Sequence, residues 1–209
     1  MKTVEKLYSD GQYQEAVKLL EEGRGQLAPS LWHYNLGTLY GKLEQWPEAR
    51  FHFLMAELNG FSSIELNQSL SLVEEKLEIG RYEKNLEFQD YLIKGMINYS
   101  DGLYTFFSLL FLLITLFLYL KKKSQKLIII TFCCSAIFLV LNLWILTWDR
   151  FIVFEKNSIY DGPSSLFKTT SELPEGVMIV TINKDGWHKI IYPSRFAGWI
   201  KDKGLKEFK

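Results

Sequence analysis

The stretch LWHYNLGTLYGKLEQWPEARFHFLMAELNGF (residues 31–61) predicts two helices separated by a short loop. Gly37 and Ala49 are small, so two helices could approach closely where these residues meet. Pro47 suits the first turn of the second helix, where no backbone N–H is needed for the helical ladder. Two helices of this length are not stable alone in water, so the pair is predicted to pack against further helices.

The same pattern recurs upstream at a constant spacing. The segment YSDGQYQEAVKLLEEG (residues 8–23) aligns with residues 41–56 at an offset of 33 residues, and residues 63–80 predict the first helix of a third, degraded copy. Stacked copies lend each other the apolar face that each one lacks. The pattern resembles the tetratricopeptide repeat (TPR), which implies helical repeats over residues 1–80 and rests on these hallmark residues: Leu36, Gly37, Tyr40, Ala49, Phe53 and Ala56.

The TPR resemblance implies a partner-binding groove on the face made by the first helix of each repeat. In the second repeat this face carries Leu31, Tyr34, Asn35 and Thr38. Asn35 stands where many TPR proteins use an asparagine to hold the backbone of a bound peptide. Residues 1–80 carry 7 basic and 12 acidic residues, a net charge of −5, so an apolar or basic partner segment is expected. The alternative is that this face only packs against the segment that precedes the membrane.

Two apolar runs without charge occupy the middle of the chain, at residues 102–120 and 127–148. At about 1.5 Å per residue, each run covers the roughly 30 Å of hydrocarbon in a bilayer. Both are predicted to be transmembrane helices, joined as an antiparallel hairpin by the basic loop KKKSQK (residues 121–126). Asn142 lies deep in the second run and is predicted to hydrogen-bond across the hairpin or to another membrane protein.

The lysines of the loop indicate the orientation, because short cytoplasmic loops are rich in Lys and Arg. We expect a protein of the inner (cytoplasmic) membrane with a cytoplasmic loop and both termini in the periplasm. The chain opens MKTVEKLYSDG, which is not an apolar signal region. A signal further upstream, another route of translocation or the inverted orientation would each account for this. Residues 81–101 predict a juxtamembrane amphipathic helix that completes the third repeat or lies on the bilayer surface.

Residues 151–209 alternate short β-rich runs with turns. The ordered landmarks YDGP (160–163), LPEG (173–176), DGW (185–187) and GWI (198–200) resemble the bacterial SH3 (SH3b) family. The resemblance implies a small all-β, SH3-like barrel that binds cell-wall peptides or protein partners. Its candidate ligand surface comprises Tyr160, Trp187 and Tyr192, whereas Trp199 is expected in the core.

The fold class is therefore multi-domain: all-α TPR repeats, a transmembrane hairpin and a small all-β barrel. This order resembles the BatE-like proteins of bacterial aerotolerance (Bat) operons, on the motifs YNLG, GQYQEA and DGWHKI…GWI. The resemblance implies a membrane-anchored scaffold linked to oxygen stress tolerance, with membrane proteins that carry von Willebrand A domains as partners. The alternative is a cell-wall anchor or sensor that binds peptidoglycan through the SH3b domain.

Motifs for chemistry are not found in the sequence. His33, His52 and His188 have neither the spacing of metal ligands nor a nucleophile and carboxylate set around them. The chain has neither a glycine-rich phosphate loop nor a basic patch that would favour nucleic acid as a partner. We expect no enzyme activity, no cofactor and no metal; the lipid bilayer is the expected non-protein partner.

Overall fold

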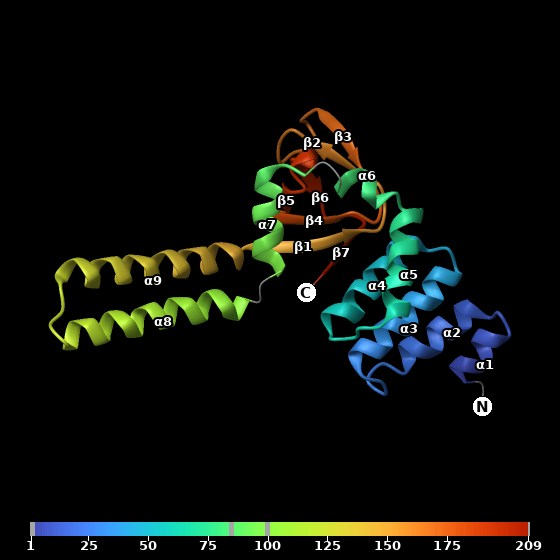
Figure 1. The fold of residues 1–209 in the computed structure, drawn as a ribbon. Helices are drawn as coiled ribbons and strands as arrows, with labels where there is room; N and C mark the ends of the chain where they lie inside the picture. Colours follow the sequence, from blue (N-terminus) through green and yellow to red (C-terminus); the bar gives the residue numbers. More distant parts are fainter. Residues whose placement is uncertain (1–2, 84–85, 99–100, 209) are drawn as a thin grey trace. The chain divides into compact units, whose positions relative to one another are not determined.

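The computed structural model describes residues 3–83, 86–98 and 101–208. Over this part of the chain, contacts divide the molecule into two compact units. The first unit combines Met1–Leu86 with Asp149–Lys209, and the second is Glu87–Trp148. Figure 1 labels their helices and strands.

The N-terminal part of the first unit is helical because its apolar residues recur at helical spacing, and two of its helices, α1 and α5, begin with a side-chain cap. The hydroxyl of Ser63, for example, accepts a hydrogen bond from the Leu66 backbone N–H at 3.1 Å. Proline lies in the first turn of α3 and of α4, as predicted for Pro47. The helices are α1 (Val4–Ser9), α2 (Tyr13–Glu22), α3 (Pro29–Lys42), α4 (Trp46–Leu58), α5 (Ile64–Lys76) and α6 (Ile79–Glu83).

The close approach of α3 and α4 depends on small residues. A Cβ atom placed on Gly37 would lie 2.6 Å from the Phe53 ring, so only glycine fits without a shift of that ring. Ala49 and Ala56 are fully buried on α4. The predicted close approach at Gly37 is confirmed, and Ala49 is fully buried, as expected of a packed position.

The C-terminal part of the first unit is a small β domain. The strands described there form a seven-stranded sheet in the order β3-β2-β6-β5-β4-β1-β7. Asp185 and Gly186 both have positive φ, at 53° and 78°, and make the tight β4–β5 hairpin that the Asp-Gly pair predicts. The strands are β1 (Trp148–Val153), β2 (Asn157–Tyr160), β3 (Thr169–Leu173), β4 (Met178–Lys184), β5 (Trp187–Tyr192), β6 (Gly198–Lys201) and β7 (Leu205–Glu207).

The helices and the sheet share one hydrophobic core. Val73, Leu77 and Ile79 from α5 to α6 belong to the same buried cluster as Ile179 and other residues of the sheet. A second cluster joins Phe51 of α4 to Ile152 and Phe208 of the β domain. The sequence predicts residues 1–80 and 151–209 as separate domains, whereas the structure places them in one unit. The reason is physical: the open end of a short helical array needs a cover for its apolar face, and here the sheet provides it.

The second unit contains α7 (Phe88–Asn98), α8 (Asp101–Leu120) and α9 (Gln125–Ile145). Within the described residues, two helical segments are long and apolar enough to cross a membrane, Gly102–Leu120 and Gln125–Ile145. The second is shorter than the predicted 127–148 at its C-terminal end, because Trp148 already begins strand β1.

The predicted single helix over residues 81–101 is also corrected. Its start belongs to α6, and α7 begins anew at Phe88, because the Asp90 carboxylate accepts a hydrogen bond from the Glu87 backbone N–H at 3.0 Å. Such a reciprocal bond from the third helical position is typical of a helix start. Residues 84–85 and 99–100 of this predicted helix lie outside the described residues.

Candidate functional site

The predicted groove residues lie on α3 in two different settings. Tyr34 is half-buried and stacks on Phe61, with ring centroids 4.6 Å apart, so its ring packs against the core rather than standing free for a partner. The Thr38 hydroxyl donates to the Tyr34 carbonyl oxygen at 3.0 Å and is satisfied locally. Leu31 is exposed, and the half-buried Asn35 amide has no hydrogen-bond partner within the described residues. Leu31 and Asn35 therefore offer the groups that a partner segment could contact.

A shallow, open hollow lies along the exposed side of α5. Its volume is about 450 Å³. Adding the 33-residue offset to Leu31, Asn35 and Thr38 gives Ile64, Gln68 and Ser71, and all three line it. The lining combines exposed apolar side chains with amides, a hydroxyl and one carboxylate: Ile64, Asn67, Gln68, Ser71, Leu72 and Glu75.

Sequence reasoning gave this α5 hollow no binding role, although the repeat offset could have found it. Ile64 and Leu72, the two large apolar side chains of this lining, are 72% and 51% exposed. The side-chain amides of Asn67 and Gln68 lie beside them and could form hydrogen bonds with the backbone of a bound segment. The arrangement suits an extended or helical protein segment with apolar side chains.

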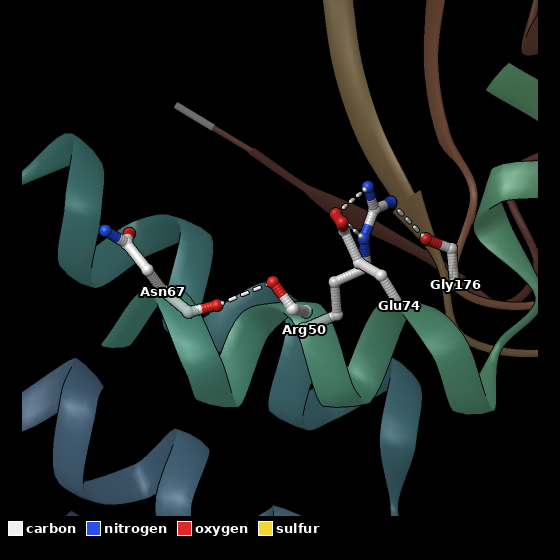
Figure 2. A network of polar contacts seen from close by, with 5 residues as sticks. Arg50, Asn67, Glu74 and Gly176 are labelled. Carbon is white, nitrogen blue, oxygen red and sulfur yellow. Dashed lines mark hydrogen bonds and ion pairs between the residues drawn. The ribbon is translucent and has the colours of Figure 1, made fainter. Parts of the chain in front are cut away.

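A buried ion pair fixes α5 to both of its neighbours. Arg50 on α4 is only 3% exposed, and its Nη2 and Nε donate to Glu74 Oε1 at 2.8 and 3.2 Å. Its Nη1 donates to the Gly176 carbonyl oxygen at 2.6 Å, which joins the helices to the turn before β4. Figure 2 shows Glu74 on the same helix as Asn67 of the α5 hollow. The position of the hollow is thus linked to the β domain through Arg50.

The charge at this junction is mixed. Glu48, at the start of α4, has its pKa raised by burial and by the nearby Glu175 carboxylate, against a backbone hydrogen bond that lowers it. Arg50 pairs directly with Glu74, and the carboxylates of Glu48 and Glu175 are close enough to act on one another. The junction is organised around one buried guanidinium.

Two histidines that the sequence left unlinked meet between α3 and α4. The Nδ1 atoms of His33 and His52 are 2.9 Å apart, so one neutral imidazole donates to the other. Burial, then His33 and Lys206, lowers the pKa of His52 to about 3. Burial and Arg24 also lower the pKa of His33. Within the described residues, no three His, Cys, Asp or Glu side chains gather in a way that would hold a metal ion.

The outer face of the β domain carries an aromatic and basic surface on β2, β6 and β5. Tyr160 and Trp187 meet edge to face, with centroids 5.4 Å apart. The Lys201 ammonium lies 5.3 Å from the centre of the Trp187 ring, and Lys189 lies 6.0 Å from that of Trp199. These contacts follow the register of the strands, in which Trp187 pairs with Lys201 and Lys189 with Trp199.

Two predictions for the β domain are corrected. Tyr192 is 1% exposed and therefore belongs to the core rather than to a ligand surface. Trp199 was expected in the core, but it is only partly buried and lies on the opposite side of β6 from the fully buried Ile200. Both corrections follow from strand alternation: neighbouring residues point to opposite faces, and only the register decides which face is the core.

Asn142 lies at the contact between α8 and α9. It is buried, and its Nδ2 donates to the Thr105 hydroxyl across the hairpin. Of the two predicted alternatives for Asn142, the structure shows the first. Two further cross-hairpin pairs that the sequence did not single out repeat the arrangement, with the Ser135 hydroxyl donating to Ser108 O at 2.9 Å and the Thr115 hydroxyl donating to that of Thr131 at 2.8 Å.

The comparisons with known proteins add no relative: no protein-family model, no curated protein and no solved structure matches the chain.

Proposed function

We propose that the chain is a membrane-anchored scaffold, not an enzyme, whose TPR-like helices bind a segment of a partner protein. The observation that carries this proposal is the α5 hollow, whose residues stand one repeat offset from those of the predicted α3 groove and which exposes Ile64 and Leu72 beside amide groups. An apolar or basic segment fits, since Glu75 is the charged residue of the lining.

The setting is a Bat-type complex linked to oxygen stress tolerance. Membrane proteins with von Willebrand A domains are the partners that the BatE-like order of modules implies. The two apolar helices anchor the scaffold in the inner membrane, with the lysine-rich loop in the cytoplasm and the first unit in the periplasm. The shared core of the two segments of the first unit supports their being on the same side of the membrane.

Site-specific photocrosslinking tests the groove. A photoreactive phenylalanine analogue replaces Gln68 in the α5 hollow or, as a control, the exposed Gln26 outside it. In native membranes, position 68 should give a defined adduct with a membrane protein, and position 26 should not. Replacing Asn35 with alanine should reduce the yield of the adduct at position 68. The bound segment would then keep a buried peptide group without a hydrogen-bond partner, which costs about 1–3 kcal/mol of binding free energy. Equal adducts at both positions, or none at position 68, would remove the groove from the proposal.

A second candidate function rests on the aromatic and basic surface of the SH3b-like domain. Aromatic rings stack on sugar rings, and lysines pair with carboxylates, so Trp187 and Lys201 suit peptidoglycan. The full-length protein in detergent should co-sediment with purified peptidoglycan, and Trp187→Ala should reduce this at least several-fold. The exposed Leu166→Ala serves as the matched control. Sedimentation that Trp187→Ala leaves unchanged would dismiss this candidate.

A further inference from the structure

Helix α7 exposes apolar residues and buries an acidic one, which is the reverse of the usual arrangement. Phe88, Tyr91 and Leu92 are 78%, 60% and 50% exposed, whereas Asp90 is 1% exposed. Contiguous exposed apolar residues of this size mark a surface that another phase or another molecule covers.

The three exposed side chains form one stripe. Positions 88, 91, 92 and 95 fall on one side of a helix with 3.6 residues per turn. Gly95 stands on the same side, where an added Cβ would meet no atom within 4 Å, and no charged residue interrupts the stripe. Asp90 lies on the other side and caps the start of the helix through the Glu87 N–H.

The occupant follows from what comes next in the chain. Helix α7 ends at Asn98, and the membrane-crossing helix α8 begins at Asp101. Three residues extend at most about 11 Å, so the end of α7 cannot lie far from the bilayer surface. Aromatic and leucine side chains on one side of a helix are typical of helices that lie in the membrane interface.

We propose that α7 lies in the plane of the bilayer interface, with Phe88, Tyr91 and Leu92 at the boundary between headgroups and acyl chains. The capped start at Glu87 ends the chain segment from the first unit and sets the beginning of the interfacial helix. This assigns the lipid surface, rather than a protein, as the partner of the stripe.

A nitroxide scan of the full-length protein in lipid nanodiscs tests the proposal. The background carries Cys133→Ala and Cys134→Ala, and single cysteines for spin labelling replace residues 88, 89 and 91–97 in turn. Asp90 is left intact because it caps the helix. The accessibility of each label to oxygen and to a water-soluble nickel complex is then compared.

Oxygen should exceed nickel at positions 88, 91, 92 and 95, and the ratio should oscillate with a period of 3.6 residues. Labels at Leu113, which is 64% exposed on α8, and at Leu166, which is 95% exposed on the β domain, give the lipid and water references. Nickel access at positions 88, 91 and 92 that equals that at position 166 would overturn the proposal. Low access to both reagents there would also overturn it, because a protein would then cover the stripe.

Discussion

Gly37 and Gly41 lie one helical turn apart on α3, yet they have opposite surroundings. A Cβ on Gly37 would press into the Phe53 ring, whereas a Cβ on Gly41 would meet nothing within 4 Å. The same substitution should therefore have opposite signs at the two positions.

Gly37→Ala is expected to lower the free energy of unfolding by about 1–3 kcal/mol through overpacking. Gly41→Ala should raise it by up to about 1 kcal/mol, because alanine favours a helix interior more than glycine does. Urea unfolding of the full-length protein in nanodiscs, followed by tryptophan fluorescence, measures both. If the two variants shift the midpoint in the same direction, the α3–α4 packing is not as described.

Arg50 is a single buried cation with partners in two distant segments. Removing one member of a buried pair costs about 3–5 kcal/mol, because the other groups keep their desolvation cost. Glu74 is one-third exposed, so we expect the lower end, about 3 kcal/mol, for Arg50→Leu. Arg81→Leu is the control, since the Arg81–Glu78 pair is exposed and should change stability by less than about 0.5 kcal/mol. Equal effects of the two variants would contradict a structural role for Arg50.

The His33–His52 pair predicts a pH dependence of stability. The folded-state pKa of His52 is lowered to about 3 from 6.5, so the unfolded chain binds its proton first. The stability that the neutral His52 contributes to the folded state is fully present above pH 6.5 and is lost as the pH falls towards 3. Between pH 7 and pH 5 the loss should be about 2 kcal/mol. The free energy of unfolding, measured by urea unfolding at several pH values, should depend less on pH in His52→Phe than in the wild type. An unchanged pH dependence would mean that other groups cause it.

At the scale of elements, hydrogen bonds of the pairs Asn142–Thr105, Ser135–Ser108 and Thr115–Thr131 join α8 and α9 between apolar surfaces. Cross-helix hydrogen bonds in membranes contribute about 0.6 kcal/mol on average and up to about 1.7. Asn142→Leu should therefore destabilise the hairpin by about 1 kcal/mol. Leu143→Ala, at an exposed neighbouring position, should have less effect. Unfolding by mixed detergent micelles, followed by helical circular dichroism, compares the two, and an unaffected Asn142→Leu protein would mean that the Thr105 contact adds no stability.

Local patterns made some elements predictable from the sequence. The close approach at Gly37, the two apolar helices and the Asp-Gly hairpin each depend on residues close together in the chain. Tyr192 and Trp199 were assigned to the wrong faces because alternation gives two equivalent choices until the sheet pairs. The start of α7 was missed because the apolar pattern of the sequence runs on without a break from residue 81. The helix start is set instead by the Asp90 carboxylate, which accepts a hydrogen bond from the Glu87 backbone N–H.

At the scale of the whole molecule, the split first unit was beyond local reasoning. The Arg50–Gly176 hydrogen bond joins residues 126 positions apart, and no periodicity reports such a contact. The α5 hollow was within reach through the 33-residue offset, but the exposure of Ile64 and Leu72 depends on which face of α5 the sheet and α4 cover. Which face of α5 stays exposed is therefore decided by tertiary packing, not by the sequence pattern of the helix.

The shared core predicts that the two segments of the first unit fold only together. A chain that joins Met1–Leu86 to Asp149–Lys209 through a flexible linker should unfold in one cooperative transition. Each segment alone should melt at a lower temperature or remain unfolded, because Val73, Leu77 and Ile179 lose their partners. Calorimetry of the three proteins measures this. Segments that melt separately at the temperature of the joined protein would restore the prediction of independent domains.

The shared core also sets the order of events during synthesis. The ribosome adds about 5–20 residues per second, so Gly176 follows Arg50 by roughly 6–25 s. During this interval the two apolar helices α8 and α9 are made, while the apolar face of α5 and α6 is still uncovered. A chain that stalls within the hairpin never receives its sheet and stays open to proteases. The first unit can therefore complete its core only after the C-terminal strands, and hence both apolar helices, have been made.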